Sequence, residues 1–224
     1  MPNHVTNEIK AAPHVLAALN GPQSIVDFNA IIPRPKCFNH EPTAMIVDLA
    51  KINMGVDRLD KEGNFRDATA VLHFSNVMRM LTEGPFLKDM ADEDLESFFG
   101  CCRAVKETGY AYWLEWCVDK WGTKWNAYDA EQIDANTVRF QTAWSPPLPV
   151  LAELAKRFPT EEIKFRWAGE DFGCNIGRLA IQGETIEGGR LPDDTRESHA
   201  LAAELLGTKC RTLGEDGRYQ RTEE

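Results

Sequence analysis

Two neighbouring segments in the middle of the chain constrain its fold more than any other feature. In residues 121–129 (WGTKWNAYD) apolar side chains alternate with polar ones around Trp125, and in residues 137–147 (TVRFQTAWSPP) the same pattern runs through Phe140 and Trp144. A period of two residues is typical of strands that bury one face. The sequence therefore predicts two adjacent strands of one sheet, and these segments hold three of the six tryptophans.

Composition is that of a folded globular protein. The 224 residues are 43% hydrophobic and 27% charged, which suffices for a sizeable core. No window reaches the roughly 18 consecutive apolar residues that a membrane span requires, and the N-terminus has no basic stretch followed by an apolar one. We therefore expect a cytoplasmic protein that does not bind membranes.

Net charge argues against one class of partner. The formal net charge is -10, and residues 40–120 carry much of the acidic excess. Such a field repels nucleic-acid phosphates at long range, although a local basic face is still compatible with it.

Helical periodicity dominates residues 36–120. Apolar side chains at spacings of three and four predict helices over 45–52, 71–81 and 95–105, with Asp92 as the N-cap of the last and Gly109 as its end. A fourth pattern over 110–120 places large aromatic side chains along one stripe, which we interpret as core.

Outside this acidic helical region the elements follow one order. The patterns predict strands over 3–10, 162–168 and 174–182 and helices over 13–20, 147–158 and 195–206, in addition to the two central strands. The last fifteen or so residues are polar and are expected to be frayed.

The order β, α, β, β, α, β predicts an α+β fold. It is the ferredoxin-like split βαβ arrangement, an antiparallel sheet with two helices on one face, here with a helical insertion between the first helix and the second strand and an extra C-terminal strand and helix. The predicted boundaries are a discontinuous core over 1–35 and 121–182, an insertion over 36–120 and a C-terminal segment over 183–224.

Several short motifs are distinctive: Met1-Pro-Asn3 with Asn7, residues 27–33 (DFNAIIP), 121–126 (WGTKWN), 142–147 (TAWSPP), Phe158-Pro159 and 170–173 (EDFG). In these motifs the chain resembles the YubB-like family, ferredoxin-fold proteins of plasmids and prophages. The resemblance implies a fold and a mobile-element setting but no mechanism. We interpret the matching residues as structural: Trp121, Gly122, Lys124, Trp125, Trp144, Pro146, Pro147 and Glu170.

Catalytic and metal-binding patterns are missing from the sequence. The five histidines are scattered, the six cysteines form no CxxC pair, and no glycine-rich segment carries the lysine of a phosphate-binding loop. We expect reduced, mostly buried cysteines, no cofactor or metal, and no enzymatic activity.

The first functional hypothesis is therefore a protein that binds a macromolecular partner. Acidic inhibitors can present carboxylates to a host defence complex where phosphates would otherwise bind. A cluster at the start of the third predicted helix could do so: Asp89, Asp92, Glu93, Asp94 and Glu96. The alternative for each of these residues is stabilisation of the helix dipole.

The second functional hypothesis is single-stranded nucleic-acid binding by the open face of the sheet. If the apolar strand residues face the two helices, polar and basic residues share the opposite face, which related folds use to bind RNA. These residues are Lys124, Tyr128, Arg139, Lys164 and Arg166. The alternative is that the acidic insertion folds over this face and neutralises it.

Overall fold

The computed structural model describes residues 3–56, 87–209 and 211–222. The chain divides into two compact units: unit 1 consists of Met1–Pro33 and Cys117–Glu224, and unit 2 is Arg34–Trp116. Residues 183–224, which the sequence suggested as a separate segment, are part of unit 1. The predicted helix over 71–81 lies outside the described residues.

Unit 1 is built on a six-stranded sheet with the order β2-β3-β1-β4-β5-β6, in which every neighbouring pair is antiparallel. The strands are β1 His4–Lys10, β2 Tyr128–Asp134, β3 Thr137–Ala143, β4 Ile163–Gly169, β5 Ile176–Gln182 and β6 Thr185–Arg190. The first four strands in this order form the ferredoxin-like arrangement, so the predicted fold class is confirmed. The sequence analysis missed β6.

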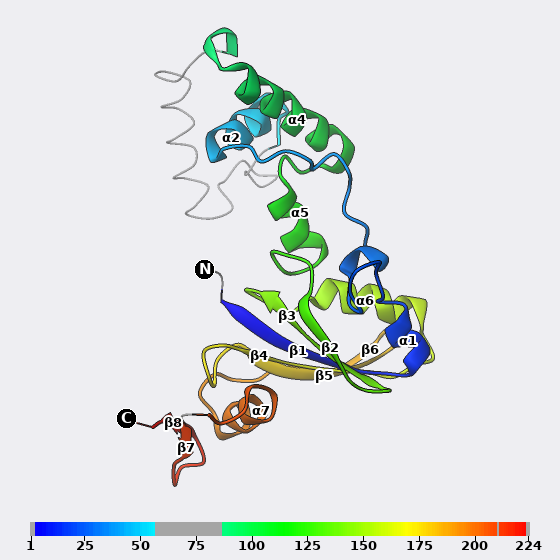
Figure 1. Cartoon of the computed structure of the whole chain (residues 1–224), viewed down its shortest axis with the longest axis vertical. Helices are drawn as coiled ribbons and strands as arrows, with labels where there is room; N and C mark the ends of the chain where they lie inside the picture. Colours follow the sequence, from blue (N-terminus) through cyan, green and yellow to red (C-terminus); the bar gives the residue numbers. More distant parts are fainter. Residues whose placement is uncertain (1–2, 57–86, 210, 223–224) are drawn as a thin grey trace. The chain divides into compact units, whose positions relative to one another are not determined.

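Helices cover both sides of this sheet. The helical elements of unit 1 are α1 Pro13–Ala17, the 3-10 helix η1 Phe28–Ala30, α6 Leu148–Arg157 and α7 Arg196–Leu206. Figure 1 shows α6 and α7 on opposite sides of the sheet. The α1 residue His14 contacts Phe158 just after α6, with ring centroids 5.6 Å apart, so α1 lies beside α6.

The main core lies between the sheet and the α1–α6 side. Alternating residues of the strands are buried there, together with the α6 residues Val150, Leu151 and Leu154 at helical spacing. The rings of Phe28 and Phe140 are 5.9 Å apart and meet edge to face.

A second, smaller core lies between the sheet and α7. Helix α7 begins with a capping box, in which Thr195 and Ser198 satisfy each other's backbone N–H groups. Its buried side pairs Leu201 and Leu205 with Ile176 of the sheet. The face that the sequence analysis treated as open is therefore partly covered by α7.

The C-terminal end of the chain is more ordered than predicted. Strands β7 Arg211–Leu213 and β8 Tyr219–Arg221 form a two-stranded hairpin where frayed residues were expected. Its docking onto α7 depends on polar contacts, which hydrophobic patterning does not reveal.

The interpretation of residues 121–129 as a strand is also wrong. Strand β2 begins only at Tyr128, and Gly122 has a φ of 80° that turns the chain after helix α5 (Trp113–Lys120). Trp125 and Trp144, predicted as structural, are 38% and 43% exposed, whereas Trp121 is buried at 2%. Of these three tryptophans, only Trp121 belongs to the core.

Unit 2 is helical and has its own core. Its elements are α2 Ala44–Asn53, the 3-10 helix η2 Leu87–Asp89, α4 Asp92–Thr108 and the start of α5 Trp113–Lys120. The predicted end of α4 at Gly109 is confirmed, with a left-handed φ of 83°. The predicted N-cap is wrong. The helix begins one position earlier than expected, so Ala91 is the N-cap residue and Asp92 is the first helical residue.

Burial keeps the best-placed cysteine unreactive. The Sγ atom of Cys101 in unit 2 lies 3.5 Å from Nε2 of His40, a spacing that would suit a nucleophile and its base. Cys101 is fully buried, however, and burial raises the pKa of its thiol to about 11. The pair is therefore a packing contact.

Two further properties bear on function. No helix among the described residues is long and apolar enough to cross a membrane. Across residues 3–56, 87–209 and 211–222, no three His, Cys, Asp or Glu side chains are arranged to hold a metal ion.

Candidate functional site

Motif residues from distant parts of unit 1 meet at one end of the sheet. We call this surface the tryptophan patch and define it by its five residues: His4, Lys124, Trp125, Tyr128 and Trp144. It combines the start of β1, the loop before β2, the start of β2 and the residue after β3. Large exposed aromatic groups gathered in this way are typical of binding surfaces.

Lys124 links the two exposed indoles. Its Nζ atom lies 4.8 Å from the ring centroid of Trp125 and 4.9 Å from that of Trp144. Both distances are in the range of cation–π attraction, which also holds the two indoles in position.

Tyr128 and His4 continue the patch. The rings of Trp125 and Tyr128 are 6.4 Å apart, and the Tyr128 hydroxyl donates to the carbonyl of Thr142 at 3.2 Å. The hydroxyl therefore accepts from Nδ1 of His4, at 2.6 Å. Burial and the charges of Asp129 and Glu170 raise the pKa of Tyr128, so the phenol is protonated at neutral pH.

The backbone at Trp144 is strained. Its φ of 76° lies in the left-handed region, which is a genuine outlier for a bulky side chain. Hydrogen bonds hold the residue on both sides: its N–H donates to the carbonyl of Asn3 at 2.8 Å, and its carbonyl accepts from Nδ2 of Asn175 at 3.2 Å. Such strain persists only where the surroundings impose it, and it concentrates at functional sites.

The two tryptophan-bearing motifs are tied to each other. The Thr123 hydroxyl donates to the carbonyl of Ala143 at 2.6 Å, and the Ser145 hydroxyl donates to the carbonyl of Gly122 at 2.5 Å. A Cβ atom at Gly122 would lie 2.6 Å from Cδ of Pro149, so this position requires glycine for space as well as for φ. Pro146 and Pro147 are buried beneath this turn and keep their predicted structural role.

Carboxylates surround the tryptophan patch. Glu170 accepts from the backbone N–H of His4 at 3.1 Å, and Asp171 accepts from Nδ2 of Asn3 at 3.5 Å. Asp129 follows Tyr128 at an irregularity of β2 and has a φ of 49°. In the described part of the chain, none of these three carboxylates forms an ion pair.

A pocket adjoins the tryptophan patch on the other side of Tyr128. It has a volume of about 760 Å³ and is lined by residues 22–25, Asp27 and residues 126–130. Asp27 Oδ1 accepts from Asn126 Nδ2 at 2.7 Å, and Asn126 Oδ1 accepts from the backbone N–H of Phe28 at 2.8 Å. The motifs DFNAIIP and WGTKWN are thus joined through the floor of this pocket.

This junction makes stability depend on pH. Burial alone would raise the pKa of Asp27, but hydrogen bonds from Asn29 and Asn126 outweigh it and lower the pKa below 3.8. The charged form therefore stabilises the fold above pH 3.8, and this contribution is lost as pH falls through the lower folded-state value. We expect Asp27→Asn to reduce stability at neutral pH and to make acid unfolding less steep in urea melts. Asn126→Ala should give an intermediate slope, and identical slopes for variant and wild type would contradict the assignment.

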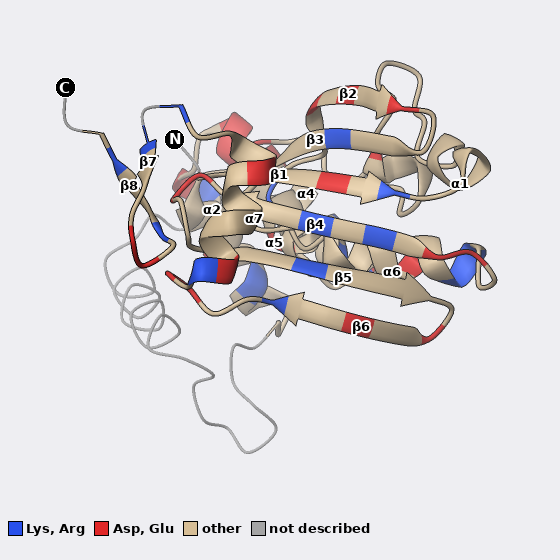
Figure 2. Cartoon of the chain, turned by 90° about the horizontal axis from the view of Figure 1, so that it is seen from below, with Lys and Arg blue, Asp and Glu red and all other residues tan. Residues whose placement is uncertain are grey.

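The predicted nucleic-acid face is largely neutralised. Glu8 lies between Arg139 and Arg166, with oxygens 2.8 Å and 2.7 Å from their guanidinium nitrogens, and Arg166 also pairs with Glu204 of α7. Figure 2, which looks onto the α7 side, shows the red band of β1 between blue bands of β3 and β4. Lys164 pairs with Glu162 at 3.1 Å.

Lys124 and Tyr128 do not join the arginines in a continuous basic face. Lys124 lies in the loop before β2, and its ammonium group is held by the two indoles. Within unit 1, helix α7 also contributes an acid, Glu204, to this sheet face.

The acidic cluster proposed for partner binding lies at the start of α4. Asp92, Glu93 and Asp94 form its first turn, where carboxylates favourably oppose the positive end of the helix dipole. Asp89 ends η2 and Glu96 follows in the second turn. A role of this cluster in partner binding stays a prediction.

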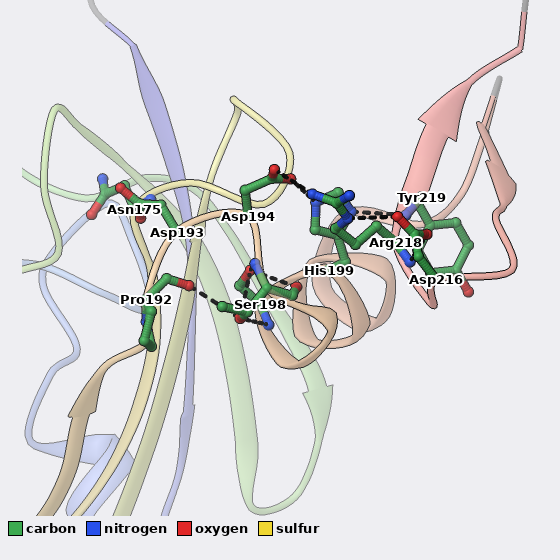
Figure 3. A network of polar contacts seen from close by, with 10 residues as sticks. Asn175, Pro192, Asp193, Asp194, Ser198, His199, Asp216, Arg218 and Tyr219 are labelled. Atoms are coloured by element: carbon green, nitrogen blue, oxygen red, sulfur yellow. Dashed lines mark hydrogen bonds and ion pairs between the residues drawn. The ribbon is translucent and has the colours of Figure 1, made fainter.

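A buried histidine docks the C-terminal hairpin (Figure 3). His199 is 4% exposed, and its Nδ1 accepts from the backbone N–H of Tyr219 at 2.8 Å. Since a backbone N–H can only donate, the proton is on Nε2, which donates to Asp194 at 2.8 Å. Arg218 pairs with Asp194 and Asp216, also at the hairpin.

Asp194, Ser198 and His199 have the residue types of a hydrolytic triad but not its geometry. The Ser198 hydroxyl donates to the carbonyl of Thr195 at 2.9 Å and accepts from the Thr195 N–H, and Nδ1 of His199 is occupied by the hairpin. A triad requires the serine hydroxyl to donate to the histidine. The network is therefore structural.

Several contributors to the candidate site were not predicted from sequence. Asn3 was noted only as part of a motif and His4 only as one of the five scattered histidines, and Asp129 and Asn175 were not singled out. One signal in the sequence could have indicated that Trp144 is exposed. It lies two residues before Pro146-Pro147, where a strand ends and its alternation of buried and exposed side chains cannot continue.

Fold and surface together define an α+β protein with a ferredoxin-like sheet and an exposed aromatic patch at its end. Residues 120–207 match the family model described as the ferredoxin-like domain in Api92-like protein. This segment includes Lys124, Trp125, Tyr128 and Trp144. The prediction of a ferredoxin-fold domain is thereby confirmed. The match supports neither the YubB-like name nor a plasmid or prophage setting.

One solved structure is similar over most of the chain. It is the protein api92 from Yersinia pseudotuberculosis, with 11% sequence identity and a TM-score of 0.39, and the similarity covers 86% of this chain and 99% of that one. No curated protein matches the chain.

Proposed function

We propose that this protein has no enzymatic activity of its own and binds a protein partner through the tryptophan patch. The observation that carries the proposal is Trp144, a bulky residue held in a strained backbone conformation with its indole 43% exposed. Core packing does not account for this arrangement, because an exposed side chain gains little from burial. A contact surface accounts for it, since tryptophan is enriched among the residues that contribute most to protein–protein affinity.

Charge favours a protein partner over a nucleic acid. Trp125, Trp144 and Tyr128 could stack on bases, and Lys124 could contact a phosphate. Three carboxylates that form no ion pair with any described residue lie near these side chains, however, and the chain has a net charge of -10. Arg139 and Arg166 are already paired with Glu8. Phosphates would therefore be repelled both locally and at long range.

The biological setting is the second part of the proposal. The motifs shared with the YubB-like family support a cytoplasmic protein of a phage or plasmid. Inhibition of a host defence complex is a function that such an acidic, partner-binding protein could perform. The acidic cluster at the start of α4 would be a second contact surface in unit 2.

Site-specific photocrosslinking tests the proposed surface. A photoreactive amino acid at position 144 should give discrete protein adducts in a bacterial lysate, whereas the same group at position 186 should give none. Ile186 is a suitable control because it is 61% exposed and lies on β6, away from the tryptophan patch. Equal adduct patterns from both positions, or none from position 144, would contradict the proposal.

Replacement of Trp144 should separate stability from function. Asparagine tolerates the left-handed conformation, so we expect Trp144→Asn to change the free energy of unfolding by less than about 1 kcal/mol. Trp144→Val, whose branched side chain does not tolerate it, should cost about 1–3 kcal/mol. Urea melts would measure both. Both variants should lose the partner, and a stability loss in Trp144→Asn as large as in Trp144→Val would show that the indole itself stabilises the fold.

A further inference from the structure

We propose that the partner's contact segment is basic and that an arginine or lysine side chain of that segment lies on the tryptophan patch. This inference rests on the proposed function and specifies the chemistry of the partner. Three observations support it: the carboxylates around the patch, the cation already held by its indoles, and the composition of the neighbouring pocket.

The carboxylates are the first observation. In the described residues, Asp129, Glu170 and Asp171 lack an ion-pair partner, whereas Glu8 and Glu162 are paired. Two of them adjoin residues of the patch: Asp129 follows Tyr128 directly in the chain, and Glu170 accepts from the backbone N–H of His4 at 3.1 Å. Against these three negative charges the patch contributes one lysine. A cationic group of a partner would therefore be attracted to this surface.

The indoles are the second observation. The ammonium group of Lys124 lies 4.8 Å and 4.9 Å from the two ring centroids, so both indoles are placed to attract a cation. A guanidinium group is planar, less strongly hydrated than an ammonium group and able to stack on an indole while it pairs with a carboxylate. Trp125 and Trp144 are 38% and 43% exposed and offer indole surface for such stacking, and Glu170, bound to the backbone N–H of His4, supplies a carboxylate at the same patch.

The pocket is the third observation. It shares Tyr128 and Asp129 with the patch and its rim, and the lining residues that the structure describes include a second acid, Asp27, but no lysine or arginine. The pocket therefore adds a further negative charge beside Tyr128 and no positive one from these residues. An extended basic segment could place one side chain on the indoles and another in the pocket.

Two-dimensional NMR of the indole N–H groups tests this inference on the full-length protein. Signals of Trp125 and Trp144 are assigned from the Trp125→Phe and Trp144→Phe variants. Titration with a short peptide of alternating glycine and arginine should shift both signals in a saturable manner. The same peptide with glutamate in place of arginine, and an oligothymidylate, should leave them in place.

A matched pair of variants identifies the carboxylates. Asp129→Asn/Glu170→Gln should weaken binding of the arginine peptide about fivefold or more, since each exposed charge contributes a fraction of a kcal/mol. Glu184→Gln/Glu187→Gln changes the net charge equally but lies at the β6 edge of the sheet, and it should leave affinity unchanged. Equal weakening in both variants would mean that net charge alone attracts the peptide, and would overturn the inference.

The other outcomes distinguish the inference from the function on which it rests. If photocrosslinking gives adducts at position 144 but the arginine peptide shifts neither indole signal, the inference of a basic contact segment is overturned and the proposal of partner binding stands. Shifts by the glutamate peptide would assign recognition to Lys124 and also overturn it. Shifts by the oligothymidylate alone would overturn both proposals in favour of nucleic-acid binding.

Discussion

Trp121→Ala is expected to lower the free energy of unfolding by about 3–5 kcal/mol, because truncation of a large buried aromatic ring leaves a cavity that the surroundings fill only in part. The indole of Trp121 is 2% exposed, its ring meets Phe28 edge to face at 5.8 Å, and its Nε1–H donates to the carbonyl of Ile32 at 2.9 Å. Loss of this residue therefore removes both packing and a buried hydrogen bond. Urea denaturation followed by far-ultraviolet circular dichroism measures the effect without relying on tryptophan emission.

Two comparisons make this result specific. Trp121→Phe keeps an aromatic ring but leaves the Ile32 carbonyl without its donor, so it should cost about 1–2 kcal/mol. Trp125→Ala removes a side chain that is 38% exposed and should cost less than about 1 kcal/mol. Similar losses for Trp121→Ala and Trp125→Ala would mean that the division into one core tryptophan and two surface tryptophans is wrong.

Glu8→Gln is expected to have the second largest effect, a loss of about 2–3 kcal/mol. Glu8 is 7% exposed and pairs with both Arg139 and Arg166, so the substitution leaves two guanidinium groups in the sheet without their shared counter-ion. The two arginine side chains are 29% and 34% exposed, which moderates the cost because water reaches them.

The same variant tests the nucleic-acid hypothesis. If Glu8 is what prevents the sheet face from binding phosphates, Glu8→Gln should gain salt-dependent affinity for single-stranded RNA or DNA in fluorescence anisotropy. Glu162→Gln frees Lys164 at the surface and should neither destabilise the protein measurably nor create binding. Equal stability of the two variants would contradict the central role of Glu8, and an equal gain in affinity would place the basic surface elsewhere.

Local patterns predicted most of the elements of unit 1. Period-two alternation located β1, β3, β4 and β5, and helical spacing with terminal glycine or proline located α1, α6 and α7. Such patterns are readable because each strand or helix must bury one face, and the order of elements then restricts the sheet to few topologies. The strand β6, residues 185–190 (TIEGGR), escaped detection because an exposed edge strand with two glycines has no apolar alternation.

The candidate site could be predicted only in part. The motifs that contain Lys124, Trp125, Trp144 and Glu170 stood out in the sequence, but their side chains were interpreted as structural. The exposure of Trp144 depends on one backbone angle. If the strand alternation continued, the side chain would be buried on the same face as Phe140, but a φ of 76° directs it to the surface.

The amino-acid sequence by itself determined the order of strands and helices, the ferredoxin-like class of the fold and the acidic character of the chain, because these depend on hydrophobic period, turn residues and composition. Only the tertiary structure decided which tryptophans are exposed, that Glu8 neutralises the arginines on either side, and that α7 covers part of the sheet face. These features depend on contacts between residues that are distant in the sequence or on a single backbone angle, and neither leaves a periodic signal along the chain.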